Sequence, residues 1–359
     1  MQPQSESNLY QSSNILAQKL FNTFEEKSVY SPLSIAYILS LLHFGAVENT
    51  DKQLTDLLAV KNSLENLFIA SKTFNTSIIK LANAIVINKC MPVKQEYLDI
   101  VGKLAFVSNA DFSNAQVIVT QVNSFIEKNT NNLIKDVLKT DMIGIDSIMI
   151  LINTLYFKAD WTHQFKKKNT RQEKFNIGST NTSDVDMMTN TKYYPYFEDS
   201  NVQQVELPYK GMEFCMGFVL PNVNNNNMNV CGQYLENTKF ESGYVEVHIP
   251  KFTQRKNLDL IPSLQKLGLT DIFCNKSRMD NMIDVPGTYA RVSTMIHEAV
   301  VIVDESGTEA AAVTVAVMRM ECMMIKPDPI VFNANHSFVY YIKHKPTNTL
   351  LFVGDYHGN

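Results

Sequence analysis

The stretch "STMIHEAVVIVDESGTEAAAVTVAVMRMECMMI", residues 293–325, decides how the rest of the chain is interpreted. Residues 293–305 are rich in β-branched side chains and predict a strand. The part that follows runs through three alanines into alternating valines and ends in methionines around one arginine, one glutamate and one cysteine. As a helix it has no polar face. An ordinary buried strand is the alternative, but the strand before it leaves little room to turn, and the charged end does not suit a core.

Composition excludes several classes of function. The chain has 359 residues, a net charge of -4, 45% hydrophobic and 19% charged residues, as in ordinary globular proteins. Lysines and arginines form no long runs, which argues against a nucleic-acid groove. No apolar run approaches about 18 residues, so no membrane span is expected.

The N-terminus and the cysteines bear on the compartment. Residues 1–21 lack a basic region followed by an apolar stretch, so no conventional signal peptide is expected. The cysteines are five, with no CxxC pair, which favours reduced thiols; they are Cys90, Cys215, Cys231, Cys274 and Cys322. We expect a cytoplasmic protein, or one secreted by a non-classical route.

The order of patterns predicts an α+β fold with helices first and sheets later. Residues 28–46 begin with a Ser-Pro start and continue as an almost wholly apolar, hence buried, helix. Residues 148–161, "IMILINTLYFKADW", are typical of a strand covered on both faces. Strands dominate from Val202 onward. No break resembles a domain boundary, so residues 1–359 are expected to form one domain.

The motifs of common enzymes are missing. The chain has no Gly-rich phosphate loop and no G-x-S-x-G elbow. "HEAVV" at His297 lacks the second histidine of a zinc-binding helix. Cys322 stays open as a nucleophile, but nothing local supports that role. No catalytic residue, metal ion or cofactor is therefore expected.

Motifs along nearly the whole chain resemble the serpin superfamily. They follow one another in the family's order: "SPLSIAYILSLLHFGAVENTDKQL" (31–54), "LINTLYFKADWTHQF" (151–165), "VELPYKG" (205–211), "VEVHIPKF" (245–252), "LQKLGLTDIF" (264–273), "VSTMIHEAVVIVDESGTEAAA" (292–312), "FNANHSFVYYI" (332–342) and "TLLFVGDY" (349–356). Departures from the pattern touch local packing: Lys27, Phe125, Ser337 and Asp355 stand where asparagine, tryptophan, proline and arginine are common.

The resemblance implies three β-sheets with about eight or nine helices and an exposed reactive-centre loop at about residues 305–328. It also implies a monomeric suicide-substrate inhibitor, which traps a serine protease as a covalent acyl-enzyme when the cleaved loop inserts into the central sheet. Residues 62–77 carry few basic side chains, which argues against heparin binding. Two alternatives stay open: a cysteine-protease target, and a non-inhibitory serpin acting as chaperone or carrier.

Residues that match the family's hinge suit insertion into a closed sheet. They are Glu305, Gly307, Thr308, Glu309, Ala310, Ala311 and Ala312. Strand alternation puts small, uncharged side chains on one face, at Thr308, Ala310, Ala312, Thr314 and Ala316. No proline interrupts residues 307–325, and Gly307 would supply a pivot.

Five further residues match positions beneath the sheet. Ser31, Ser34, Asn153 and His297 resemble the polar cluster called the shutter, where hydroxyls, an amide and an imidazole can exchange partners as strands part. A satisfied polar cluster that only stabilises the fold is the alternative. Trp161 resembles the aromatic residue of the breach, where the loop first enters.

The sequence does not determine which bond of the loop is cleaved. Counting forward from Gly307 gives Glu321–Cys322 or, one residue earlier, Met320–Glu321, whereas counting back from Phe332 gives Met323 or Met324. Methionine would suit a chymotrypsin- or cathepsin G-like pocket, arginine a trypsin-like one, and glutamate an acid-preferring protease. The candidates in order of preference are Met320, Arg319 and Glu321, with Cys322 and Met318 beside them.

Overall fold

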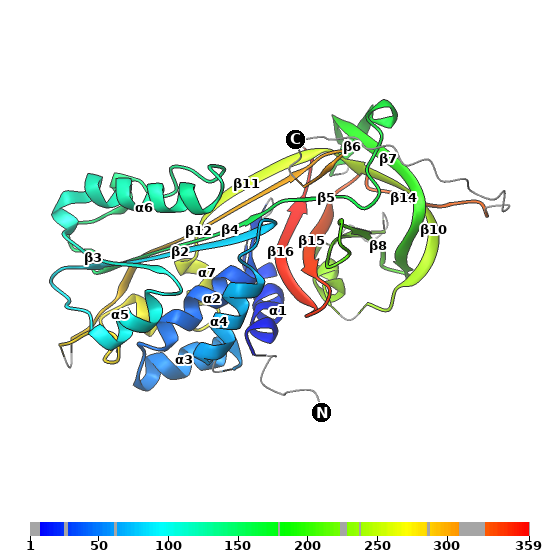
Figure 1. Cartoon of the computed structure of the whole chain (residues 1–359). Coiled ribbons are helices and arrows are strands. Elements are labelled where there is room, and N and C mark those ends of the chain that lie inside the picture. Colours follow the sequence, from blue (N-terminus) through cyan, green and yellow to red (C-terminus); the bar gives the residue numbers. More distant parts are fainter. Residues whose placement is uncertain are drawn as a thin grey trace.

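A seven-stranded sheet lies between two helical layers in this computed structural model, which describes residues 8–24, 28–60, 63–178, 180–222, 228–236, 238–285, 288–308 and 327–358. Figure 1 shows α6 on one face of the sheet and α1 to α4 on the other. The α-helices are α1 (Asn8–Phe21), α2 (Pro32–His43), α3 (Glu48–Leu58), α4 (Leu64–Thr73), α5 (Gln95–Val101), α6 (Ala115–Asn129) and α7 (Ile261–Lys266).

The seven-stranded sheet has the order β3-β2-β4-β12-β13-β5, with β11 paired to β12. Its members are β2 (Ile79–Asn88), β3 (Phe106–Ala110), β4 (Met149–Phe157), β5 (Ala159–Asp160), β11 (Phe252–Asp259), β12 (Val292–Val303) and β13 (Gly307–Thr308). All nine positions of β4 are buried, as expected for a strand covered on both faces.

A nine-stranded network forms the other half of the molecule. It contains β1 (Val29–Tyr30), β6 (Arg171–Ile177), β7 (Asn181–Glu198), β8 (Val202–Pro208), β9 (Phe214–Pro221), β10 (Glu241–Pro250), β14 (Ile330–Asn333), β15 (Phe338–His344) and β16 (Thr349–Tyr356). Strand β7 belongs to both parts of this network. Most of β7 pairs with β6 and β10, and its last three residues, 196–198, pair with β8 of the other part. Counted as two sheets, these parts and the seven-stranded sheet give the expected three.

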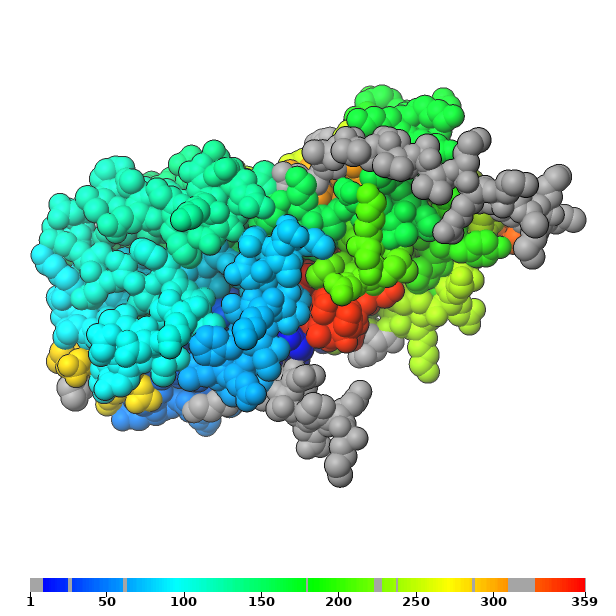
Figure 2. All heavy atoms as spheres, viewed as in Figure 1, coloured from blue at the N-terminus to red at the C-terminus, as the bar shows by residue number. Residues whose placement is uncertain are grey.

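Strand alternation divides the core into two clusters. On one face, Leu151 and Leu155 of β4 and Ala299 of β12 join the large cluster beneath α1 to α4. On the other face, Ile150 and Ile152 join a separate cluster with α6 and the segment after it. Figure 2 shows the teal atoms of α6 and this segment at the surface of that half of the molecule.

Helix α2 is buried along its whole length, as the sequence predicts. Ser31 caps it by accepting a hydrogen bond from the Ser34 amide, and Pro32 occupies the first turn. The cap thereby fixes two polar side chains at the point where α2 meets the sheet.

Two departures from the family pattern interact with their neighbours near the C-terminus. The Asp355 carboxylate accepts a hydrogen bond from the Ser28 amide at 2.6 Å and contacts His357 Nε2 at 2.6 Å. His357 Nδ1 lies 3.0 Å from the Ser337 hydroxyl. Both residues therefore have local polar partners.

Candidate strand-insertion site

Strands β4 and β12 are parallel neighbours that share one long seam. Their register runs from Val292 opposite Met149 to Ala299 opposite Leu155, so the two strands are hydrogen-bonded directly to each other. Beyond this point they separate. Val303 of β12 pairs with Thr308 of β13, which pairs in turn with Ala159 of β5. The chain thus places its own residues 307–308 in the gap where the seam opens.

A tight turn at residues 304–307 directs the chain into this gap. The Asp304 side chain accepts hydrogen bonds from the amides of Ser306 (2.8 Å) and Gly307 (3.1 Å). A Cβ atom at Gly307 would lie 2.1 Å from the Ala159 carbonyl oxygen. Glycine is needed here because two backbones approach closely, a different reason from the pivot expected from the sequence.

The Thr308 side chain is buried and contacts an aromatic residue. It is 1% exposed, and its hydroxyl lies 2.6 Å from the Tyr209 hydroxyl. The Tyr209 ring stacks on Trp161, with centroids 4.5 Å apart and planes 9° from parallel. Trp161 also donates from Nε1 to the Asp304 carbonyl at 2.9 Å. The expected breach residue therefore lies against the point where residues 307–308 enter the sheet.

Glu305 fastens the turn from its other side. Its carboxylate, 8% exposed, accepts from the Lys251 ammonium and the Thr170 hydroxyl, each at 3.0 Å. Burial opposes ionisation of Glu305, but hydrogen bonds from its own backbone, Lys251 and Thr170 outweigh it and lower its pKa. The turn is held by a charge-assisted interaction with a partly exposed lysine.

A continuous polar cluster lies under the middle of the seam. Asn83, Asn153 and His297 occupy opposed positions on β2, β4 and β12. The Asn153 oxygen accepts from the Ser34 hydroxyl at 2.6 Å and from His297 Nδ1 at 2.7 Å. The Asn153 amide donates to the Ser34 carbonyl at 2.7 Å and to the Asn83 side chain at 2.5 Å. Every polar group of the Asn153 side chain is therefore satisfied within the cluster.

His297 is neutral and has one defined tautomer. Its Nε2 accepts from the Ser31 amide at 2.9 Å, so the proton is on Nδ1, which donates to Asn153. Burial lowers the pKa of His297 to about 3. The imidazole thus joins α2 to both strands of the seam without carrying a charge.

The structure brings together the four residues that match the shutter, Ser31, Ser34, Asn153 and His297. Asn83, Tyr209 and Lys251 also contact residues of the predicted site, although the sequence predicts no role for them. Tyr209 and Lys251 lie inside the quoted motifs. Asn83 interrupts the apolar pattern of residues 79–88, and a polar residue at a buried strand position is the sequence signal that could have indicated its role.

The remaining predicted residues lie outside the described part of the chain. These are the hinge residues Glu309, Ala310, Ala311 and Ala312 and the bond candidates Met318, Arg319, Met320, Glu321 and Cys322. Within the residues that the structure describes, no group of three or more His, Cys, Asp or Glu side chains could hold a metal ion. None of the described helices combines the length and apolar character that crossing a bilayer requires.

The chain thus has a β4–β12 seam that residues 307–308 enter at one end and that a polar cluster underlies. The family model described as "Serpin (serine protease inhibitor)" matches residues 11–358, and the chain belongs to the serpin family.

Individual comparisons agree with this family. A serpin-like protein of Acanthamoeba polyphaga mimivirus is 38% identical over 97% of this chain and 89% of its own length. Human serpin B4 is 30% identical over 94% of this chain and 95% of its own. The crystal structure of native protease nexin-1 with heparin has a TM-score of 0.87 at 23% identity, covering 98% of this chain and 99% of that one, which shows the fold.

Proposed function

We propose that this serpin is an active suicide-substrate inhibitor of serine proteases. The observation that carries the proposal is the entry of Gly307 and Thr308 between β12 and β5, directly in line with the β4–β12 seam. A strand that continues from Thr308 would extend along the seam, because its first residues already occupy that register.

The proposed reaction begins with attack of the protease on the loop, which forms an acyl-enzyme. Insertion of a cleaved loop into a sheet is an established conformational switch of serpins. About fifteen inserted residues at ~3.3 Å each would carry the bound protease some 50 Å. Distortion of its oxyanion hole would then stop deacylation, since loss of one hole donor alone costs ~10²–10³ in rate.

The composition of residues 308–317 supports insertion. The face that contains Thr308 has only small, uncharged side chains in the sequence, and Thr308 itself is buried. Glu309 falls on the opposite face, where its charge can remain in water. An unpaired charge on the inward face would oppose insertion.

Incubation with a panel of serine proteases tests the inhibitory function. We expect an SDS-resistant complex with a chymotrypsin- or cathepsin G-like protease, and mass spectrometry of the released peptide should place the cut after Met320. A cut after Arg319 would change the proposed target to a trypsin-like enzyme, and a cut after Glu321 would change it to an acid-preferring one. A covalent complex with a cysteine protease would instead support the alternative that the target is a cysteine protease.

Thermal unfolding after cleavage separates an inhibitor from a non-inhibitory relative. An inserted loop adds a central strand, so the cleaved protein should melt well above the uncleaved one. Equal melting temperatures, with cleavage verified by mass, would show that the loop stays outside and would favour a chaperone or carrier function.

A further inference from the structure

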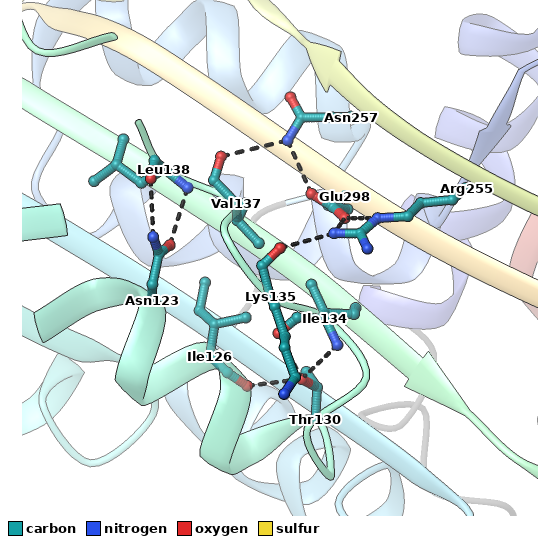
Figure 3. Close-up of polar contacts among 10 residues, drawn as sticks. All are labelled: Asn123, Ile126, Thr130, Ile134, Lys135, Val137, Leu138, Arg255, Asn257 and Glu298. Carbon is teal, nitrogen blue, oxygen red and sulfur yellow. Dashed lines mark hydrogen bonds and ion pairs between the residues drawn. The ribbon is translucent and has the colours of Figure 1, made fainter. Parts of the chain in front are cut away.

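The segment between α6 and β4, residues 130–148, crosses the seam on the face opposite the polar cluster. Ile134, Val137 and Leu138 of this segment pack in one cluster with Ile152 of β4 and Ile296 of β12. The segment therefore covers both strands that would have to separate. Figure 3 shows it lying over the strands of the sheet.

One side of the segment is fastened to α6. The Asn123 side chain donates to the Leu138 carbonyl at 2.9 Å and accepts from the Leu138 amide at 3.0 Å. Lys135 forms an ion pair with Glu127 at 2.6 Å. Helix α6 itself rests on β2, which lies on the β4 side of the seam.

The other side of the segment is fastened to β11 and β12. The Arg255 guanidinium donates to the Lys135 carbonyl at 2.7 Å, and the Asn257 amide lies 3.4 Å from the Val137 carbonyl. Both side chains also bind the Glu298 carboxylate, at 2.6 Å from Arg255 Nε and 2.9 Å from Asn257. We call these three side chains and two carbonyls the clasp (Figure 3).

Glu298 organises the clasp from inside the structure. Its side chain is 2% exposed, whereas that of Arg255 is 49% exposed. A buried carboxylate needs donors for both oxygens, and Arg255 and Asn257 supply them. Because these donors are held by Glu298, their remaining hydrogens are directed at the segment. The contacts to the carbonyls can break in water while the ion pair persists.

Strand insertion changes the distance that the segment must span. Adjacent strands lie about 4.8 Å apart, so a new strand between β4 and β12 would double their separation to about 9.6 Å. The segment is fastened to α6 on one side and to β11 and β12 on the other. It cannot keep both sets of contacts when the two sides move apart. One fastening must open, and the solvent-exposed Arg255 contact is the weaker of the two because water competes for it.

We propose that the clasp is a brake on strand insertion, released when the Lys135 and Val137 carbonyls leave Arg255 and Asn257. This inference rests on the proposed function. The brake sets how fast the seam opens, and hence how a cleaved acyl-enzyme divides between trapping and release of the protease. Loosening the clasp speeds insertion and destabilises the uninserted form.

The double variant Arg255→Gln/Glu298→Gln tests this, because it removes the charged contact of Arg255 with the Lys135 carbonyl without leaving a buried charge unpaired. Lys256→Gln, on the next residue of β11 and the opposite face, is the matched control. The probe is a synthetic peptide with the sequence of residues 308–320, whose annealing to the uncleaved protein is followed by native electrophoresis. We expect annealing about tenfold faster in the double variant, the effect of one lost charge-assisted hydrogen bond, and no change in the control.

Two further measurements separate a brake from a general stabilising contact. Hydrogen exchange of residues 130–139 should accelerate in the double variant before any peptide is added. In the double variant, the melting temperature of the uncleaved form should fall by more than that of the peptide-annealed form, because both forms lose the Arg255–Glu298 ion pair but only the uncleaved form also loses the contact with the segment. Asn257→Ala, which removes the Val137 contact and one donor to Glu298 but keeps the Arg255–Glu298 ion pair, is the second variant should the double variant fail to fold.

Opposite outcomes point to different failures. Unchanged annealing in both variants, or an equal fall in both melting temperatures, would overturn the brake while leaving strand insertion intact. If the unmodified protein neither anneals the peptide nor traps a protease, the proposed function fails, and the brake fails with it.

Discussion

The hydroxyl groups of Thr308 and Tyr209 lie 2.6 Å apart in a fully buried contact at the end of the seam where the two strands separate. This contact joins the hinge residue to the aromatic stack of Tyr209 on Trp161. The first step of the proposed insertion is thus already present in the uncleaved chain, at two residues, and its consequences can be measured.

If the protein is an inhibitor as proposed, Thr308→Arg should turn it into a substrate of the protease while the fold is retained. An arginine here would have to leave the sheet, because burying an unpaired charge costs several kcal/mol. Only the two-residue strand β13 would be lost with it. The stoichiometry of inhibition should rise steeply, with cleaved protein replacing the SDS-resistant complex on gels. Thr308→Ser, which keeps the hydroxyl, is the control, and full trapping by the arginine variant would contradict the inward assignment.

Glu305→Gln should weaken the turn that directs the chain into the seam. The side chain would lose its ion pair with Lys251, and we expect the free energy of unfolding to fall by about 0.5–1.5 kcal/mol, as for one hydrogen bond. Asp184→Asn, which breaks the exposed pair with Lys174, should have little effect. Urea unfolding of both variants provides the comparison.

The effect of Glu305→Gln should also depend on pH. The pKa of Glu305 is lowered in the folded state. Its contribution is therefore fully present above the unfolded pKa of about 4.3 and is lost as the pH falls through the lower, folded pKa. Unfolding curves of the unmodified protein and of the Glu305→Gln variant should differ at neutral pH and approach each other in acid. A difference that persists unchanged in acid would show that charge is not the cause.

His297 should make the protein less stable in mild acid. Its pKa is lowered to about 3 by burial, whereas an unfolded histidine has a pKa near 6.5. Between these values the unfolded chain binds a proton that the folded chain does not. The free energy of unfolding should therefore fall as the pH drops from about 6.5, by at most ~1.4 kcal/mol per pH unit from this residue.

Comparison with His297→Gln isolates that contribution. The stability difference between the two proteins should be largest above about pH 7 and shrink toward pH ~4, because the folded and unfolded pKa values bracket this window. His248→Gln, which changes a half-buried histidine on β10, is the control. A difference independent of pH would mean that folding does not lower the pKa of His297.

Asn83→Ala tests the member of the polar cluster for which the sequence predicts no role. The variant leaves the Asn153 amide with one acceptor fewer inside the protein. An unsatisfied buried donor costs about 1–3 kcal/mol, and the free energy of unfolding should fall by that amount. The exposed Asn176, replaced by alanine, should show almost no change. If Asn83→Ala leaves the free energy of unfolding unchanged, Asn153 does not depend on this contact.

The sequence by itself determined the class of fold and most of the residues that meet at the seam. The apolar helix at 32–43, the fully buried strand at 149–157 and the motif around His297 each have a pattern that local physics explains. The resemblance to serpins grouped Ser31, Ser34, Asn153 and His297, which hydrogen bonds join in the structure, and it assigned to the entry point Trp161, which donates to the Asp304 carbonyl. The helix and the strands follow from periodicity and residue type, which are properties of short segments, whereas the grouping of the polar residues and the place of Trp161 were implied by the resemblance alone.

Tertiary structure alone decided which strands pair and what the polar side chains contact. Asn83 meets Asn153 through the register of β2 on β4, and Thr308 meets Tyr209 across 99 residues of chain. The clasp joins Arg255 and Asn257 to carbonyl oxygens 120 residues away, and a backbone carbonyl has no signature in a sequence. Such contacts depend on how distant strands are brought side by side, and no local pattern specifies that.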